Sequence, residues 1–174
     1  MKDTKDYLIV DGYNIIFSWP EMEKLRKAGL DHARTKLLDI LVNYAAYSGE
    51  SVVVVFDAHL VKNNLEHAEY IDSNVEVIYT QEKETADSVI ERLVKELAVR
   101  GRVHVATSDW AEQSMVFGLG AYRLTPRELS DKIKSLKQEG EKHYVSTSPS
   151  ESYLENRLVE EVRKALEMWR RKKR

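Results

Sequence analysis

The chain of 174 residues contains no cysteine, only three prolines and only seven glycines. Without cysteine it cannot form a disulfide scaffold, a zinc site built on thiolates or a thiol nucleophile. The low glycine and proline content excludes collagen-like and low-complexity chains. No apolar run approaches about 18 residues, so the sequence predicts no membrane span. A hydrophobic fraction of 43% and a charged fraction of 32% instead indicate a globular domain with a sizeable core.

The charges are unevenly distributed along the chain. Residues 1–6 are mostly charged and lead into a short apolar segment without a signal-peptide core, so we expect a cytoplasmic protein. The net charge is −2, yet residues 157–174 carry eight Lys or Arg and three Glu, so the preceding part is acidic. The basic end is typical either of a solvated helix terminus, where cations favour the helix dipole, or of a phosphate-binding segment.

Short apolar runs alternate with segments of helical period. Strands are predicted at residues 7–10, 52–56, 75–79, 103–106 and 121–124. Helices are predicted at residues 32–47, 86–99, 111–117, 126 to about 138, and after 148. This alternation predicts an α/β fold, with a mostly parallel central sheet between two layers of helices. Residues 58–74 and 139–147 look irregular.

Capping residues support several of these helix boundaries. Asp31 is a predicted N-cap of the 32–47 helix, and Gly49 is its predicted end. Thr125 and Glu128, with Pro126 between them, form the pattern of a capping box.

Acidic residues follow the predicted strands. Asp11 comes directly after the first strand, Asp57 after the second and Asp109 shortly after the fourth, and Asp87 lies in the connection that follows the third. In parallel α/β sheets, ligands bind beyond the carboxyl ends of the strands. If the strands are neighbours, these four acids therefore converge at one edge of the sheet.

Such a cluster needs a neutralising partner, because crowded carboxylates repel each other and burial penalises their charge. Protonation is one solution and a divalent cation is the other. Oxygen ligands without cysteine or paired histidine favour Mg²⁺ or Mn²⁺ over zinc. The chemistry that follows is hydrolysis of a phosphodiester by metal-activated water. Asn14 is a polar neighbour that could hold a carboxylate or a phosphate oxygen.

Each acid also has a purely structural interpretation. Asp11 precedes a glycine and could start a turn, Asp57 could cap a loop, and Asp87 lies where a carboxylate favours the helix dipole. Asp109 could be an N-cap, with Glu112 completing a capping box. The joint position of all four at strand ends favours a shared site.

Four motifs together resemble the YacP-like branch of the NYN domains, which belong to the PIN-like nucleases. They are Asp11-Gly12-Tyr13-Asn14, Phe56-Asp57-Ala58-His59, Glu84-Thr85-Ala86-Asp87 and Thr107-Ser108-Asp109. With the Trp169-Arg170-Arg171 ending, the resemblance covers nearly the whole chain. It implies a PIN-like three-layer α/β/α fold with a C-terminal helix. We expect residues 1–147 to form the nuclease domain and residues 148–174 to form an amphipathic, basic-ended helix packed on it.

The resemblance also implies an activity. It implies a metal-dependent endoribonuclease that cuts mRNA in the aminoacyl-site region of translating ribosomes. Asp11, Asp87 and Asp109 are the implied metal-binding and catalytic acids, Asp57 is a supporting acid, and Asn14 is the polar residue of the family motif.

An RNA backbone approaching an acidic pocket needs cations to guide it. The candidates for RNA or ribosome contact are Lys62, Lys83, Arg123, Arg127, Arg170 and Arg171, the last two opening a basic run that continues to Arg174. Four aromatic residues flank the acidic motifs and could either stack on bases or pack in the core. They are Tyr13, Trp19, His59 and Trp110.

Two other functions are compatible with parts of the pattern. A phosphatase of the haloacid-dehalogenase type also has an Asp after its first strand, but it needs a second Asp two positions on, where this chain has Tyr13. A non-catalytic RNA- or ribosome-binding module would use the same acids only to cap helices.

Overall fold

The structure is a computed structural model that describes residues 5–57, 59, 68–81 and 83–146. The first segments in chain order are β1 (Lys5–Asp11), α1 (Gly12–Ser18), the short 3₁₀ helix η1 (Pro20–Met22), α2 (Glu23–Ala28) and α3 (Leu30–Ser48). They are followed by β2 (Ser51–Phe56), β3 (Ala68–Asp72), β4 (Val75–Tyr79) and α4 (Ala86–Leu97). The last are β5 (Gly101–Ala106), α5 (Trp110–Gly118), β6 (Tyr122–Leu124) and α6 (Pro126–Ser146).

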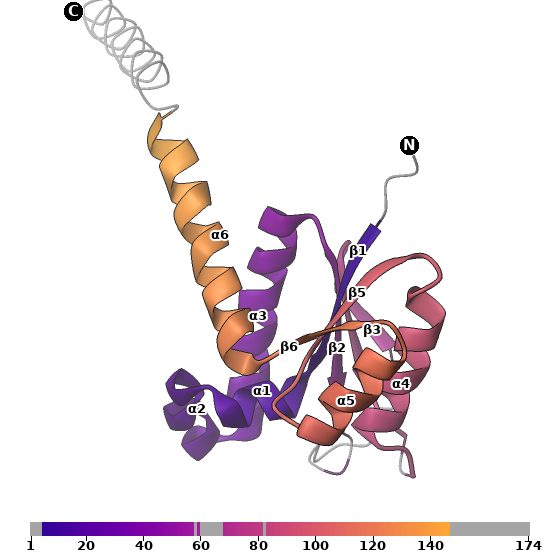
Figure 1. Cartoon of the computed structure of the whole chain (residues 1–174). Coiled ribbons are helices and arrows are strands. Elements are labelled where there is room, and N and C mark those ends of the chain that lie inside the picture. The colour runs from indigo at the N-terminus through magenta and orange to yellow at the C-terminus, as the bar shows by residue number, and fades with distance from the viewer. Residues whose placement is uncertain (1–4, 58, 60–67, 82, 147–174) are drawn as a thin grey trace, which may run out of the picture. The chain divides into compact units, whose positions relative to one another are not determined.

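The sheet places β1 at its centre. Its strand order is β3-β4-β2-β1-β5-β6, and all neighbours are parallel except the antiparallel pair β3 and β4. The parallel strands β2, β1 and β5 therefore end side by side at one edge of the sheet. The acidic motifs that follow these strands meet there (Figure 1).

Helices cover both faces of the sheet, and each face has its own apolar core. Alternate side chains along β1 point to opposite faces, as the pleat of a strand requires. Leu8 and Val10 pack with α1 and α3, whereas Tyr7 and Ile9 pack with α4 and α5. Burial on both faces explains the nearly continuous apolar runs of these strands. The predicted three-layer α/β arrangement is confirmed.

The chain divides into two compact units, residues 1–136 and residues 137–174. The first unit contains the whole sheet and the start of α6, where the half-buried Ile133 and Leu136 pack against the core beside α3. Of the second unit, the structure describes only the end of α6. The predicted helix at residues 148–174 lies outside the described residues, so the predicted domain organisation stays a prediction. Within the described ranges, no helix is both long and apolar enough to cross a membrane.

Three predicted boundaries are wrong. Residues 68–72 form β3 and not a loop; this strand lies at the sheet edge, where the apolar pattern is weak. The helix from Pro126 continues to residue 146, because Gly140 costs only about 1 kcal/mol and no proline follows until Pro149. Asp31 is not the N-cap of α3, because the helix begins at Leu30. Asp31 lies in the first turn and forms an ion pair with Arg34.

Other predicted caps are confirmed. Gly49 ends α3 with a left-handed backbone (φ 72°). The capping box at α6 is reciprocal: the Thr125 N–H donates to Glu128 Oε2 (2.7 Å), and the Glu128 N–H donates to Thr125 Oγ1 (3.2 Å).

Gly12, the first residue of α1, provides a test of the close packing behind the site. A Cβ at this position would overlap the ring of Phe56, which is fully buried. We expect Gly12→Ala to lower the free energy of unfolding by about 1–3 kcal/mol, measured by urea denaturation. The matched control is Gly118→Ala, at the end of α5, where a Cβ meets nothing within 4 Å. Equal stabilities of the two variants would contradict the expected overlap.

Candidate active site

Three helices begin at the carboxyl edge of the sheet, and each carries an acid in or next to its first turn. Asp11 is the N-cap of α1 and accepts a hydrogen bond from the Asn14 N–H (3.2 Å). Asp87 lies in the first turn of α4, and Glu112 in the first turn of α5. The positive ends of the helix dipoles stabilise negative charge at these positions. The fold therefore brings together the acids and the helix N-termini that partly compensate their negative charge.

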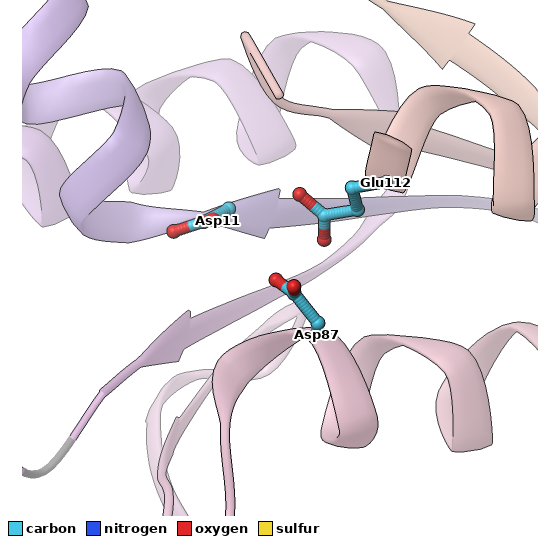
Figure 2. Close-up of side chains that lie close together, drawn as sticks. All are labelled: Asp11, Asp87 and Glu112. Carbon is cyan, nitrogen blue, oxygen red and sulfur yellow. The ribbon is translucent and has the colours of Figure 1, made fainter. Parts of the chain in front are cut away.

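Asp11, Asp87 and Glu112 form one cluster. Each offers a carboxylate oxygen, and these oxygens all lie within 4.8 Å of one another. Figure 2 shows the three side chains close together, from the end of β1, from α4 and from α5, with the carboxylates of Asp87 and Glu112 directed toward each other. The predicted pair Asp11 and Asp87 thus comes together. Glu112 joins them, although its sequence pattern indicates only a capping box.

Glu112 is the most confined of the three. It is only 3% exposed, and neither of its carboxylate oxygens has a hydrogen bond of normal geometry within the described part of the chain. Burial raises its pKa to about 8; an interaction with the Thr107 side chain opposes this rise, and the charges of the neighbouring acids add to it. A buried carboxylate without a partner is costly unless something fills its coordination.

The pKa values of the other two acids are also raised. Burial raises the pKa of Asp11 to about 6, opposed by the Asn14 N–H and reinforced by the charges of Asp87, Asp57 and Asp109. Burial also raises the pKa of Asp87, together with the charges of Asp109 and Asp57. The cluster therefore holds protons to higher pH than separate carboxylates would, which is the behaviour of a site that lacks positive charge.

The donor set fits a divalent cation. It consists of carboxylate oxygens, the ligands that hard cations prefer. Opposite oxygens around an ion of the size of Mg²⁺ are about 4.2 Å apart. Separations of at most 4.8 Å are close enough that small side-chain movements would bring the oxygens into contact with such an ion. Two unpartnered oxygens of Glu112 facing the cluster supply free coordination.

Asp109 and Asp57 lie beside the cluster and make local hydrogen bonds. Asp109 is the N-cap of α5, and its Oδ1 accepts from the N–H groups of Ala111 (2.7 Å) and Glu112 (3.1 Å). The capping box does not form, because the Asp109 N–H donates to Thr107 Oγ1 and Glu112 turns inward. Asp57 Oδ1 accepts from the His59 N–H (2.9 Å). The predicted metal role of Asp109 stays a prediction.

Asn14 fastens the loop between β5 and α5 to α1. Its Oδ1 accepts from both the N–H (2.7 Å) and the hydroxyl (2.5 Å) of Ser108. The same loop is held from the other side, where Gln113 Nε2 donates to the buried carbonyl of Thr107 (2.7 Å). Asn14 therefore positions the segment that carries Asp109 and Glu112; its predicted contact with a carboxylate or a phosphate oxygen stays a prediction.

An open cleft of about 560 Å³ lies over this edge of the sheet. Three of the predicted acids, Asp11, Asp57 and Asp87, line it. The remaining lining residues come from α1, from the segments after β2 and β5, and from the start of α4; they are Tyr13, Asn14, Phe17, Ser18, His59, Thr85, Ala86 and Ser108. The volume is in the range of small-ligand sites.

Of the predicted RNA-contacting cations, three lie within the described residues and three lie outside them. Lys83 and Arg127 are exposed, and Arg127 is 4.0 Å from Asp131 in the same helix. Arg123 is exposed but donates to Gln113 Oε1 (3.1 Å). Lys62, Arg170 and Arg171 lie outside the described residues. The predicted contact of these cations with RNA therefore stays a prediction.

The flanking aromatic residues divide into core and surface. Tyr13 and Trp19 are buried; Tyr13 also lines the cleft, and Trp19 Nε1 donates to the Pro126 carbonyl (2.9 Å). His59 is exposed in the cleft lining. Trp110 is 74% exposed at the start of α5.

The protein is thus a mostly parallel α/β domain with an acidic cleft at the carboxyl ends of its strands. The family model described as YacP-like NYN domain matches residues 8–171. The chain belongs to this family. It is 41% identical over 167 residues to the protein YacP of Bacillus subtilis (strain 168), covering 95% of this chain and 97% of the relative.

Solved structures agree with this assignment. The crystal structure of Rae1 (YacP) from Bacillus subtilis is similar with a TM-score of 0.72 and 41% identity, over 95% of both chains. A crystal structure of a mutant of that protein is similar with a TM-score of 0.69 and 38% identity, over 83% of this chain and 84% of the other. The predicted family is confirmed.

The raised pKa values predict a pH-dependent cost of keeping the cluster folded. Glu112 has a pKa of about 8 in the folded chain against 4.5 for an ordinary glutamate, so its contribution to stability is present at low pH and is lost as the pH rises toward 8. In EDTA, we expect Glu112→Gln, which stays neutral, to become increasingly more stable than wild type between pH 5 and pH 8.5. The difference in the free energy of unfolding should reach a few kcal/mol at the upper end.

Urea denaturation at several pH values measures this difference. Ser114→Ala on the exposed side of α5 controls for changes in the helix itself. Parallel pH profiles of wild type and Glu112→Gln would contradict the raised pKa.

Proposed function

We propose that the protein is a cytoplasmic, metal-dependent endoribonuclease that cleaves mRNA on translating ribosomes. The observation that carries the metal-dependent chemistry is the buried carboxylate of Glu112, which makes no hydrogen bond of normal geometry in the described chain and lies within reach of Asp11 and Asp87, two acids that line an open cleft. Membership of the nuclease-like NYN family supports phosphodiester cleavage and an RNA substrate.

Asp11, Asp87 and Glu112 would hold the cation, which we propose to be Mg²⁺ or Mn²⁺. When bound, such an ion supplies charge neutralisation at a phosphoryl oxygen and lowers the pKa of water. Asp109, proposed from the sequence as a further ligand, adds negative charge to the cluster while it caps α5. Asp57 adds charge from the lining of the same cleft.

The residues of the chain set the geometry of the reaction. Asn14 and Gln113 fix the loop before α5, so the carboxylates keep their mutual positions when substrate enters. The oxygen of a water molecule joins the phosphorus as the bond from phosphorus to the 3′ oxygen breaks. One hydrogen of the water ends on the 3′ hydroxyl, and the other remains on the 5′-phosphate or dissociates from it.

The charge distribution of the chain supports action on the ribosome and not on free RNA. The body of the chain is acidic and the last five residues are all Lys or Arg. An acidic body disfavours strong binding to free RNA, whereas a basic tail favours contact with the phosphates of ribosomal RNA.

Substitution of the central acids tests the activity. In a translating system with Mg²⁺, we expect Asp11→Asn and Asp87→Asn to reduce mRNA cleavage by more than about 100-fold, since even residues that only support metal ligands contribute tenfold to 100-fold. The measurement is the mapping of RNA ends. The matched control is Asp39→Asn on the exposed side of α3, which should cleave like wild type.

The outcome separates the candidate functions. Full cleavage by both variants would refute the assignment. Ribosome binding without any cleavage by wild type would favour the non-catalytic module, and a covalent phosphate on Asp11 would favour a phosphatase.

The basic tail has its own test. We expect the affinity for ribosomes to fall steeply with salt, and replacement of residues 170–174 by glutamines to flatten this dependence. Each cation that contacts a phosphate contributes about one to the slope of log affinity against log salt. Sedimentation with ribosomes between 50 and 300 mM salt, on the order of the range where phosphate contacts weaken, gives both slopes. Unchanged slopes would exclude the tail from the contact.

A further inference from the structure

Helix α1 presents one face to the core and another to the cleft. Ile15 and Ile16 are fully buried, whereas the residues at positions 13, 14, 17 and 18 line the cleft. Phe17 is the exception in this second group, because it is a large apolar side chain that remains 51% exposed. The cleft therefore combines acids from the sheet edge with an exposed aromatic ring on its α1 side.

The ring of Phe17 is the outer end of a row of aromatic side chains that begins in the core. Tyr79 stacks on Phe56 (5.7 Å between ring centroids), Phe56 meets the edge of Tyr13 (5.0 Å), and Tyr13 lies 6.5 Å from Phe17. The guanidinium of Arg26, from α2, lies over the Phe17 ring at 5.1 Å. These contacts hold the exposed ring in place, so it can offer a surface without first being ordered.

We propose that Phe17 stacks on an unpaired base of single-stranded RNA while the adjoining phosphate lies over the acid cluster. This inference rests on the proposed function for its substrate. An aromatic face binds any nucleobase, because every base has a π-face. A base within a duplex is already stacked on its neighbours, so the ring selects single-stranded RNA.

The positions of Phe17 and Asp11 suit binding of a base by the first and of its phosphate near the second. Phe17 and Ser18 follow Asn14 on the same short helix, and Asp11 caps the start of that helix. Asp11 and Phe17 therefore lie at opposite ends of a seven-residue helix, about 9 Å apart along its axis. This is comparable to the reach from a phosphate to the far side of its nucleoside, so one nucleotide can touch both.

The test measures binding and does not require cleavage. All proteins carry Asp11→Asn so that the RNA stays intact. The probes are a fluorescent single-stranded RNA octamer and a series in which each position in turn lacks its base. Fluorescence anisotropy at low salt gives the dissociation constants. With Phe17 present, one position should be sensitive: loss of its base weakens binding by about 5- to 150-fold.

Variants at position 17 then identify the surface on which that base stacks. With Phe17→Ala, the intact octamer should bind as weakly as the octamer lacking the sensitive base, and loss of that base should have no further effect. Phe17→Trp should keep the sensitivity. The matched control is Phe117→Ala, at the far end of α5, which removes a ring that is 72% exposed and should change nothing.

Three results would overturn the proposal: equal binding of all octamers to the protein with Phe17, an effect of Phe17→Ala no larger than that of Phe117→Ala, or no binding of any octamer at low salt. The proposed function can fail separately. If wild type never cleaves RNA but the sensitive base and its dependence on Phe17 remain, the stacking surface stands and the nuclease activity does not.

Discussion

Repulsion between carboxylates is the constraint on which the site depends. Parallel strands that end side by side bring carboxylate oxygens of Asp11, Asp87 and Glu112 within 4.8 Å of one another, although like charges at that distance oppose folding. The protein offsets part of this cost with the positive ends of α1, α4 and α5. The remainder is visible in the raised pKa values of all three acids. The fold thus has a position where positive charge would offset the repulsion between these acids.

The rest of the architecture supports that position. The sheet core is apolar on both faces, and Gly12 allows α1 to turn away tightly against Phe56. Asn14 links α1 to the loop before α5 through Ser108. Polar residues that look like ordinary turn and cap residues in the sequence therefore act together as the frame of the site.

Much of the fold follows from the sequence because its signals are local. Val52–Phe56 is apolar enough to be a central strand, and Thr125 with Glu128 marks a helix start without reference to the rest of the chain. Strand β3 escapes prediction because it pairs on one side only and needs fewer apolar residues. Convergence of Asp11 and Asp87 is predictable from strand order, since both follow parallel strands. The inward turn of Glu112 is not, because it depends on side-chain direction and on the competing bond from Asp109 to Thr107.

The three acids come from distant parts of the chain, at positions 11, 87 and 112, and β1 lies between β2 and β5 in the sheet. A polypeptide synthesised only as far as α4 contains two of the acids, Asp11 and Asp87, but neither β5 nor α5, which place Glu112. It cannot form the cluster, however well its first half folds. A nascent chain of this protein therefore lacks the complete acidic cluster until its synthesis has passed the start of α5.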